Sequence, residues 1–111
     1  MDTLNRYRDI IEQVLTNIID PAEPNAPSRE HPVFDRRSDH YLVIREGWEG
    51  DHRLHHCLVH LELRDGKVWI QKDGIEYGIA TDLERAGIPK SDIVLGFHPA
   101  DVRPYTEYAA A

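Results

Sequence analysis

The apolar positions of the first twenty residues repeat at helical spacing. The members of this stripe are Leu4, Tyr7, Ile11, Val14 and Ile18. Because they recur every three or four residues, they share one side of a helix, and the pattern predicts a helix over residues 3–20. Asp2 or Thr3 can cap its first turn, and Pro21 stops it from continuing. We expect the stripe to pack on its own domain; docking of a second chain is the alternative.

Residues 21–32 contain four prolines and no apolar period. Proline lacks the backbone donor that a strand ladder needs and fixes φ, so the pattern predicts an extended surface connector rather than a strand. This connector joins the N-terminal helix to a β-rich core, residues 33–111, that contains one short helix. We expect the whole chain, residues 1–111, to form a single domain.

Alternation of apolar and polar residues dominates the middle of the chain. The predicted strands cover residues 33–37, 40–48, 53–64 and 67–72. The inward face of the third strand is expected to carry Cys57, Val59, Leu61 and Leu63. Asp65-Gly66 separates the third strand from the fourth and is typical of a type I′ hairpin turn, which needs positive φ at both centres. Asp73-Gly74 predicts a second turn after the fourth strand.

The period changes after Gly78. Apolar residues at helical spacing predict a helix over residues 79–87, with Thr81 or Asp82 as its cap. Residues 93–97 are an apolar run of strand length, and the tail beyond them is expected to add a short edge segment. Consecutive strands with helices at the two ends predict an α+β fold. The N-terminal helix should cover one face of a four- to five-stranded antiparallel sheet, with the short second helix at an edge or end.

Charge and cysteine content narrow the classes of function. Thirteen basic and twenty acidic residues give a formal net charge of −7, which disfavours direct DNA binding by this chain alone. Arg36-Arg37 and Arg53 are the only candidates for a phosphate patch. Cys57 has no second cysteine to pair with, which favours a reducing compartment. The chain shows neither a signal-peptide pattern nor an apolar run of membrane-spanning length, so we expect a soluble cytoplasmic protein without a membrane partner.

Histidines are frequent, with seven in the chain. His56 and His60 share one face of a predicted strand but lie about 13 Å apart, too far to bind one metal ion without a bend. Cys57 is expected to be a small core residue rather than a nucleophile. No nucleotide-binding or serine-hydrolase motif is present, and we expect no cofactor.

A group of acidic residues follows the fourth predicted strand. Asp73, Glu76 and His98 are candidates for a metal-dependent hydrolase or nuclease site, because carboxylates and imidazole bind divalent cations. His60 is a further candidate for the same site. The alternative is that the acidic residues beside Gly74 only form a turn.

Trp48 and Trp69 are the largest apolar side chains of their strands. Lys67 and Gln71 flank Trp69 on the same strand face, which indicates a semi-exposed tryptophan of the kind that is enriched at interaction surfaces. Burial of Trp69 beneath the N-terminal helix is the alternative.

A partner surface is expected around Trp69, with Phe97 and Tyr105 nearby as further apolar members. This surface would bind a second protein or another copy of the chain. The candidate binding residues are Trp48, Lys67, Trp69, Gln71, His98 and Arg103.

The stretch from Lys67 to Pro99 is the most distinctive part of the chain. With it belong Gly47-Trp48-Glu49-Gly50, Arg53, His60, Gly66, Arg103, Thr106, Ala109 and the RYRDII run of the N-terminal helix. Together these segments resemble the XisI family, the cyanobacterial controlling factors for excision of the fdxN element. Ile75 stands where the family has threonine, and Tyr108 stands where phenylalanine is usual.

The resemblance implies an XisI-like fold and a role in programmed, site-specific DNA excision, alongside a recombinase and a second controlling factor, XisH. It implies no catalytic residue. We therefore expect a non-catalytic accessory factor that acts through contacts with an XisH-like partner and the recombinase. A metal-dependent hydrolase or nuclease is the alternative.

Overall fold

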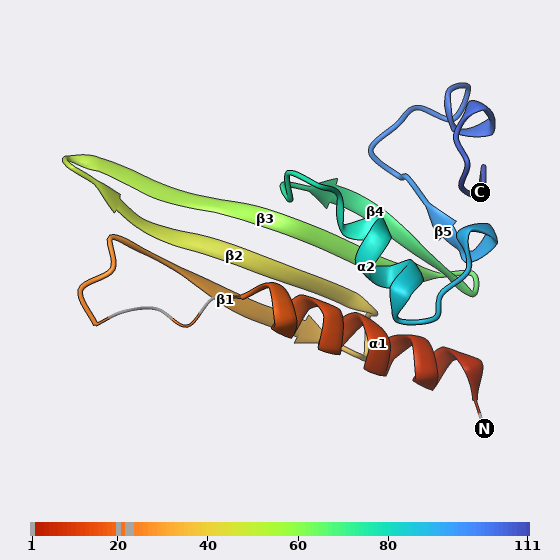
Figure 1. Cartoon of the computed structure of the whole chain (residues 1–111), viewed down its shortest axis with the longest axis horizontal. Coiled ribbons are helices and arrows are strands. Elements are labelled where there is room, and N and C mark those ends of the chain that lie inside the picture. Colours follow the sequence, from red (N-terminus) through yellow and green to blue (C-terminus); the bar gives the residue numbers. More distant parts are fainter. Residues whose placement is uncertain (1, 20, 22–23) are drawn as a thin grey trace.

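The computed structural model describes residues 2–19, 21 and 24–111 (Figure 1). The elements in chain order are α1 (Thr3–Ile18), β1 (Ser28–Asp35), β2 (His40–Glu49), β3 (His52–Arg64), β4 (Lys67–Asp73), α2 (Ile79–Arg85), η1 (Lys90–Asp92), β5 (Ile93–Val94) and η2 (Arg103–Tyr105), where η marks a 3₁₀ turn. Within these ranges no helix is both long enough and apolar enough to cross a membrane.

The five strands form one sheet in the order β1-β2-β3-β4-β5. Neighbouring strands from β1 to β4 are antiparallel. The predicted α+β fold with an N-terminal helix, a sheet and a short second helix is therefore confirmed. The wholly antiparallel arrangement needs a correction, because β5 runs parallel to β4. Residues 74–92, which include α2, carry the chain back along the sheet, as a parallel connection requires.

The helix α1 covers one face of the sheet through the predicted apolar stripe. Asp2 caps it, since the Asp2 carboxylate accepts a hydrogen bond from the Leu4 amide at 3.0 Å. The buried residues of α1 are Tyr7, Ile11, Val14 and Leu15. They pack in one core cluster with inward-facing strand residues such as Tyr41, Val59, Leu61 and Ile70. The stripe thus packs on its own domain, as expected.

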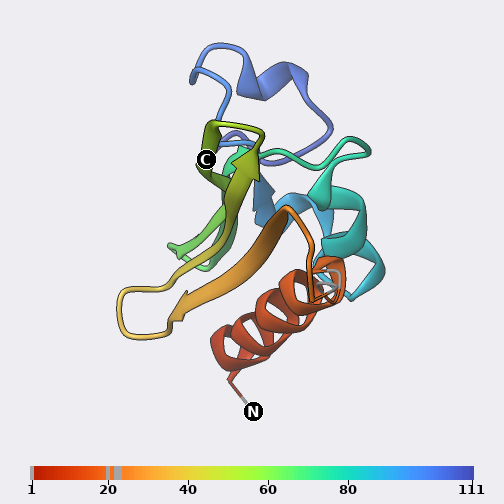
Figure 2. The same cartoon turned by 90° about the vertical axis from the view of Figure 1, so that its left-hand side faces the viewer.

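The second helix lies beside α1 rather than at an edge or end of the sheet. Ile79 and Leu83 of α2 belong to the same core cluster as α1, and Figure 2 shows both helices on one side of the sheet. The predicted caps, Thr81 and Asp82, are also wrong. The helix begins after Gly78, and neither side chain makes a capping hydrogen bond.

The first strand begins earlier than predicted. It runs over Ser28–Asp35, so residues 28–32, which were assigned to the connector, pair with β2. Pro32 is tolerated because β1 is an edge strand, where a missing donor can face away from the ladder. Pairing with β2 determines where β1 begins, and the local sequence of residues 28–32 does not indicate this pairing.

The turn after β3 agrees with its prediction. Asp65 and Gly66 have φ values of 53° and 78°, as a type I′ turn requires. The strands on either side of this turn pair in antiparallel register from Arg64 and Lys67 onward. The prediction that residues 53–64 pair with residues 67–72 is confirmed.

A bulge in β3 changes which residues face the core. Val43 lies opposite Val59, but the next β2 residue, Ile44, lies opposite Cys57, which leaves Leu58 as an extra residue. Val43 and Val59 are fully buried under the helices, so Ile44 and Cys57 point to the other face. The prediction that Cys57 faces inward is therefore wrong, because one inserted residue reverses the alternation.

The last predicted strand is shorter than the apolar run that indicated it. Only Ile93–Val94 pairs with β4. The chain then turns, with the Gly96 amide donating to the Val94 carbonyl and the His98 amide to the Leu95 carbonyl. The tail returns to the edge of β5, where Ala109 bridges Val94, and this confirms the expected edge segment.

Asp39 connects α1 to the sheet. The Arg8 guanidinium donates to both Asp39 carboxylate oxygens at 2.8 and 3.1 Å, and the hydroxyl of the buried Tyr41 donates to one of them at 2.9 Å. The Asp39 carbonyl accepts a hydrogen bond from the Leu63 amide of β3. The hydrogen bond from Arg8 is the main reason why the pKa of Asp39 lies below its ordinary value.

We expect Asp39→Asn to lower the free energy of unfolding at pH 7 by roughly 1–3 kcal/mol, because hydrogen bonds to a charged group are lost. Asparagine tolerates the left-handed backbone of this position, φ 58°. Since folding lowers the Asp39 pKa, its contribution is complete above the unfolded-state pKa of about 3.9 and fades as the pH falls through the folded-state value. Urea unfolding at pH 7 and pH 3 should show the wild-type advantage shrinking in acid. Asp51→Asn, in the exposed β2–β3 turn, is the control, and equal stability of Asp39→Asn and wild type at pH 7 would contradict the assignment.

Candidate interaction surface

The side of the sheet opposite the helices presents mixed apolar and histidine side chains. Cross-strand pairing places Val33 opposite Leu42, Leu42 opposite His60, and Ile44 opposite Cys57. Both α-helices lie on the other side (Figure 2). We call this surface the open face; its members are Val33, His40, Leu42, Ile44, Trp48, Cys57 and His60. It has the composition of a protein contact surface, with apolar residues bordered by titratable ones.

Trp48 marks the far end of the open face. It lies near the tip of the β2–β3 hairpin, which projects well beyond the ends of the helices in Figure 1. The indole is 54% exposed, and the Arg53 guanidinium lies 5.3 Å from the centre of its ring. The Trp48 amide donates to the Pro27 carbonyl, which fixes the backbone at this point. A large aromatic side chain is thus held in place and left open to contact, as an interface anchor requires.

Trp69 does not have the semi-exposed position that was predicted. It is 6% exposed, and it also does not lie beneath the N-terminal helix. Ile70 points toward α1 and the core cluster, so its neighbour Trp69 points to the opposite side of the sheet. Both interpretations of Trp69 failed for one reason: the segment that covers it comes from residues more than twenty positions later in the chain.

That covering segment, residues 95–109, is called here the C-terminal segment. The Arg103 guanidinium lies 5.1 Å from the Trp69 ring centre, and Arg64 lies over the same ring at 3.7 Å. Gly96 approaches so closely that a Cβ atom there would lie 3.2 Å from the indole and 2.9 Å from the Gln71 amide oxygen. Two cationic side chains and a close glycine therefore hold the indole in place, and the predicted binding residue Arg103 packs against Trp69.

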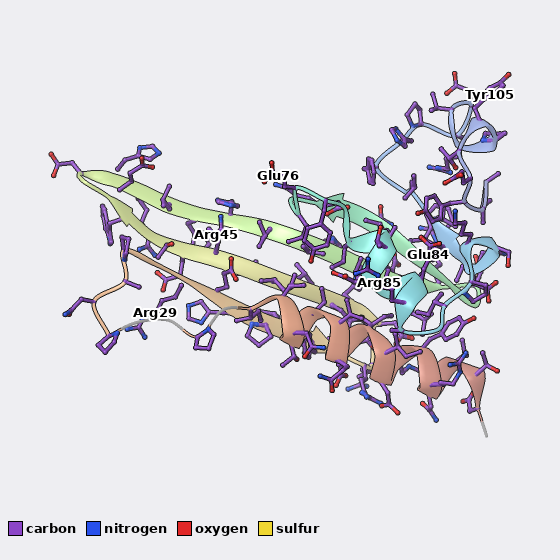
Figure 3. The ribbon with its side chains drawn as sticks, viewed as in Figure 1. Arg29, Arg45, Glu76, Glu84, Arg85 and Tyr105 are labelled. Carbon is purple, nitrogen blue, oxygen red and sulfur yellow. The ribbon has the colours of Figure 1, made fainter. Side chains whose placement is uncertain are left out.

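The other predicted binding residues are dispersed. Gln71 donates to Glu62 at 3.0 Å, and Lys67 is half-buried opposite Arg64. The His98 ring stacks on Phe97 with centroids 4.6 Å apart, and Phe97 is 47% exposed. The C-terminal segment also carries the highly exposed Tyr105, labelled in Figure 3.

The three candidate metal ligands do not form a site. Asp73 is engaged with the backbone, since its carboxylate accepts from the Ile75 amide at 3.0 Å and from the Ile79 amide at 2.9 Å. It therefore caps α2 and closes the turn. Glu76 is exposed on the loop after β4 (Figure 3), and His98 belongs to the C-terminal segment. In the described ranges no three His, Cys, Asp or Glu side chains gather closely enough to hold a metal ion.

A pair of histidines on the open face escaped the sequence analysis. His40 Nδ1 lies 2.9 Å from His60 Nε2, and His40 Nε2 lies 3.7 Å from a Glu62 carboxylate oxygen. Burial, and then the neighbouring His40, lowers the pKa of His60. The sequence analysis compared histidines along one strand only, whereas this pair lies across two.

Counting residues along β2 and β3 from the hairpin turn between them does not predict this pair, because β3 contains the bulge at Leu58. Trp48 lies opposite Arg53 near the hairpin tip, and continuing that register would place His60 opposite Tyr41 on the core side. The extra residue in β3 moves His60 opposite Leu42 instead, on the open face and diagonal to His40.

A hollow of about 410 Å³ lies on the other side of the molecule, between α1 and α2. Gln13, Asn17, Tyr77 and Arg85 are among its lining residues, and Figure 3 shows Arg85 on α2. The Tyr77 hydroxyl donates to Asp82 at 2.8 Å. The lining thus combines amide, phenol and charged groups.

Comparison with known proteins decides the family. A family model described as XisI protein matches residues 1–110. The chain belongs to the XisI family. A crystal structure of a XisI-like protein from Anabaena variabilis ATCC 29413 has a TM-score of 0.88 and 31% identity, over 97% of this chain and 99% of that one. The fdxN element excision controlling factor XisI from the same organism has a TM-score of 0.84 and 33% identity, over 99% of this chain and 100% of that one. No curated protein matches the chain.

The two departures from the XisI pattern have structural roles in this member. Ile75 packs against the core cluster, so the side chain adds apolar contact where the family has a hydroxyl. The hydroxyl of Tyr108 donates to Glu84 of α2 at 2.8 Å. Phenylalanine lacks this donor, and the Tyr108 hydrogen bond is one means by which the C-terminal segment is attached to α2.

We expect Trp69→Ala to lower the free energy of unfolding by about 3–5 kcal/mol, the usual loss for a core tryptophan. Trp69→Phe should cost less, because its ring still fills most of the space and because the buried Trp69 Nε1 has no hydrogen-bond partner among the described residues. Denaturant unfolding of the three proteins measures this order. A Trp69→Ala variant as stable as wild type would show that the indole is not held by the C-terminal segment.

Proposed function

We propose that this chain is a non-catalytic accessory factor in the programmed excision of a DNA element, and that it acts by binding other proteins of the excision machinery. The carrying observation is its XisI-family match over residues 1–110 together with its likeness to a protein named fdxN element excision controlling factor XisI. The roles of an XisH-like second factor and of a site-specific recombinase as partners are part of this proposal.

The net charge of the chain and the ion pairing of its basic residues support indirect action on DNA. The net charge is −7. Among the residues that the structure describes, six Lys and Arg side chains are in ion pairs with carboxylates: Arg8, Arg36, Arg45, Arg53, Arg64 and Lys90. Of the sequence candidates for a phosphate patch, Arg36 and Arg53 are in this set and Arg37 is not. Arg36 contacts Asp9 and Glu12 at 2.6 Å each, and Arg53 contacts Glu46 at 3.2 Å. Phosphate would have to displace these carboxylates, which weakens any electrostatic attraction to DNA.

The open face is the surface that we assign to the XisH-like partner. It combines the exposed Trp48 and Val33 with half-buried aliphatic side chains, and the helical layer leaves it uncovered. Binding through the sheet edge is disfavoured, because the edge strand β1 contains Pro32 and charged residues such as Arg29 and Glu30 (Figure 3 labels Arg29). The partner should therefore lie on the face of the sheet instead of extending it.

We expect no sequence-specific DNA binding tighter than micromolar by the isolated chain at near-physiological salt. The physical reason is the net negative charge together with the pairing of Arg36 and Arg53. Gel-shift titration of the purified chain against duplex DNA measures this. A specific complex at nanomolar protein concentration would overturn the proposal of indirect action.

We expect Trp48→Ala to weaken binding to an XisH-like partner at least about tenfold, as loss of an interface tryptophan does. The melting temperature should stay close to that of wild type, because the side chain is 54% exposed near a hairpin tip. Binding is measured by calorimetry or surface plasmon resonance with the purified partner.

Tyr77→Ala is the matched control for this experiment. Tyr77 is also an exposed aromatic residue, at 63%, but it lines the hollow between α1 and α2. Loss of binding in Tyr77→Ala with retention in Trp48→Ala would place the partner on the helical side and contradict the assignment to the open face.

A further inference from the structure

The histidine pair on the open face has the geometry of two metal ligands that already converge. His40 Nδ1 and His60 Nε2 face each other at 2.9 Å, and the two ring centroids are 5.1 Å apart. Two Zn–N bonds of about 2.0–2.1 Å at a tetrahedral angle separate their nitrogens by about 3.3 Å. The two rings are within hydrogen-bond distance of each other, so to hold an ion between them the pair must give up this hydrogen bond and open by roughly 0.4 Å.

The strands that carry the pair keep it in place. His40 begins β2 and His60 lies within β3, and the two strands are hydrogen-bonded along their length. Both residues lie on the open face, with intermediate exposure. Water can therefore reach an ion held there, and the ligands need no rearrangement of the backbone to meet.

Glu62 supplies the support that metal-bound histidines commonly have. One Glu62 carboxylate oxygen lies 3.7 Å from His40 Nε2, and the other accepts a hydrogen bond from Gln71 at 3.0 Å. At 3.7 Å the two groups are too far apart for a hydrogen bond. The Glu62 carboxylate would have to move closer on ion binding to accept a proton from Nε2, and the lone pair of His40 would then lie on Nδ1, facing His60. Carboxylates in this position orient the ring and make the metal-binding nitrogen more basic.

Charge around the pair is balanced. Arg64 lies 3.7 Å from Glu62. Lys72 of β4 is the cross-strand neighbour of His60, but it is exposed, so its ammonium can remain in water.

We propose that His40 and His60 form a binding site for one divalent transition-metal ion such as Zn²⁺, with Glu62 as a positioning residue that holds the His40 tautomer. The protein supplies two imidazole nitrogens, and water fills the other coordination positions. Imidazole ligands suit Zn²⁺, Cu²⁺ and Ni²⁺ rather than Mg²⁺ or Ca²⁺. The site lies on the open face, the surface assigned above to the partner, but ion binding by the isolated chain can be measured whether or not the proposed excision role holds.

Calorimetric titration of the untagged chain with Zn²⁺ tests the proposal. We expect one ion per chain, binding abolished or weakened more than tenfold in His40→Gln and in His60→Gln, and weakening of about tenfold in Glu62→Gln. Mg²⁺ should give no comparable heat. His56→Gln is the matched control, because His56 lies on the same strand but opposite Arg45, on the other side of the sheet.

A second measurement needs no substitution. In NMR spectra of the wild-type chain, Zn²⁺ should shift the imidazole resonances of His40 and His60 and leave those of His56 unchanged. Wild-type binding retained in both His40→Gln and His60→Gln, or Zn²⁺-induced shifts confined to other histidines, would overturn the proposal. The same conclusion would follow if Zn²⁺ gave neither heat nor shifts.

Discussion

One carboxylate links α1 to two strands of the sheet. Asp39 receives Arg8 from the helix and Tyr41 from β2, while its backbone carbonyl receives an amide of β3. Apolar packing alone is not directional, so a helical stripe can shift along a sheet at little cost. The bidentate Arg8–Asp39 pair fixes the position of α1 along the strands, because its two hydrogen bonds have a fixed geometry. With α1 fixed, α2 has one place to pack, and the opposite face is left open.

The sequence predicted those parts of the fold that depend on neighbours in the chain. The spacing of the α1 stripe and the Asp65-Gly66 turn are local signals, and both were interpreted correctly. The start of β1 and the direction of β5 depend on partner strands, so no local pattern contains them. Cys57 shows the same limit on a smaller scale. The bulge at Leu58 lies within the apolar run Cys57-Leu58-Val59, and this run alone does not show which of the three residues faces away from the core.

The candidate site was less predictable than the fold. Trp48 and Trp69 are the same residue type on two strands of one sheet, β2 and β4, yet only Trp48 is exposed, because Arg103 and Gly96 from a distant segment cover Trp69. Asp73 had the residue type of a metal ligand, but one of its oxygens accepts from Ile75 in the turn after β4 and the other from Ile79 at the start of α2. In both cases the chemistry of the side chain was clear from the sequence, and its role was decided by contacts that only the tertiary structure supplies.

Because the C-terminal segment covers Trp69, the order of chain synthesis determines how long this indole stays exposed. When β4 leaves the ribosome, β5 and residues 95–109 have not yet emerged, so one edge of the growing sheet is unpaired and a large indole lies open to water. Unpaired edges and exposed aromatic surfaces favour association between nascent chains. The four-stranded intermediate is thus the stage at which nascent chains are most prone to associate with one another. A stop codon shortly after Val94 would keep β5 but remove residues 95–109, so every chain would have its helical core and an uncovered Trp69 on the opposite face.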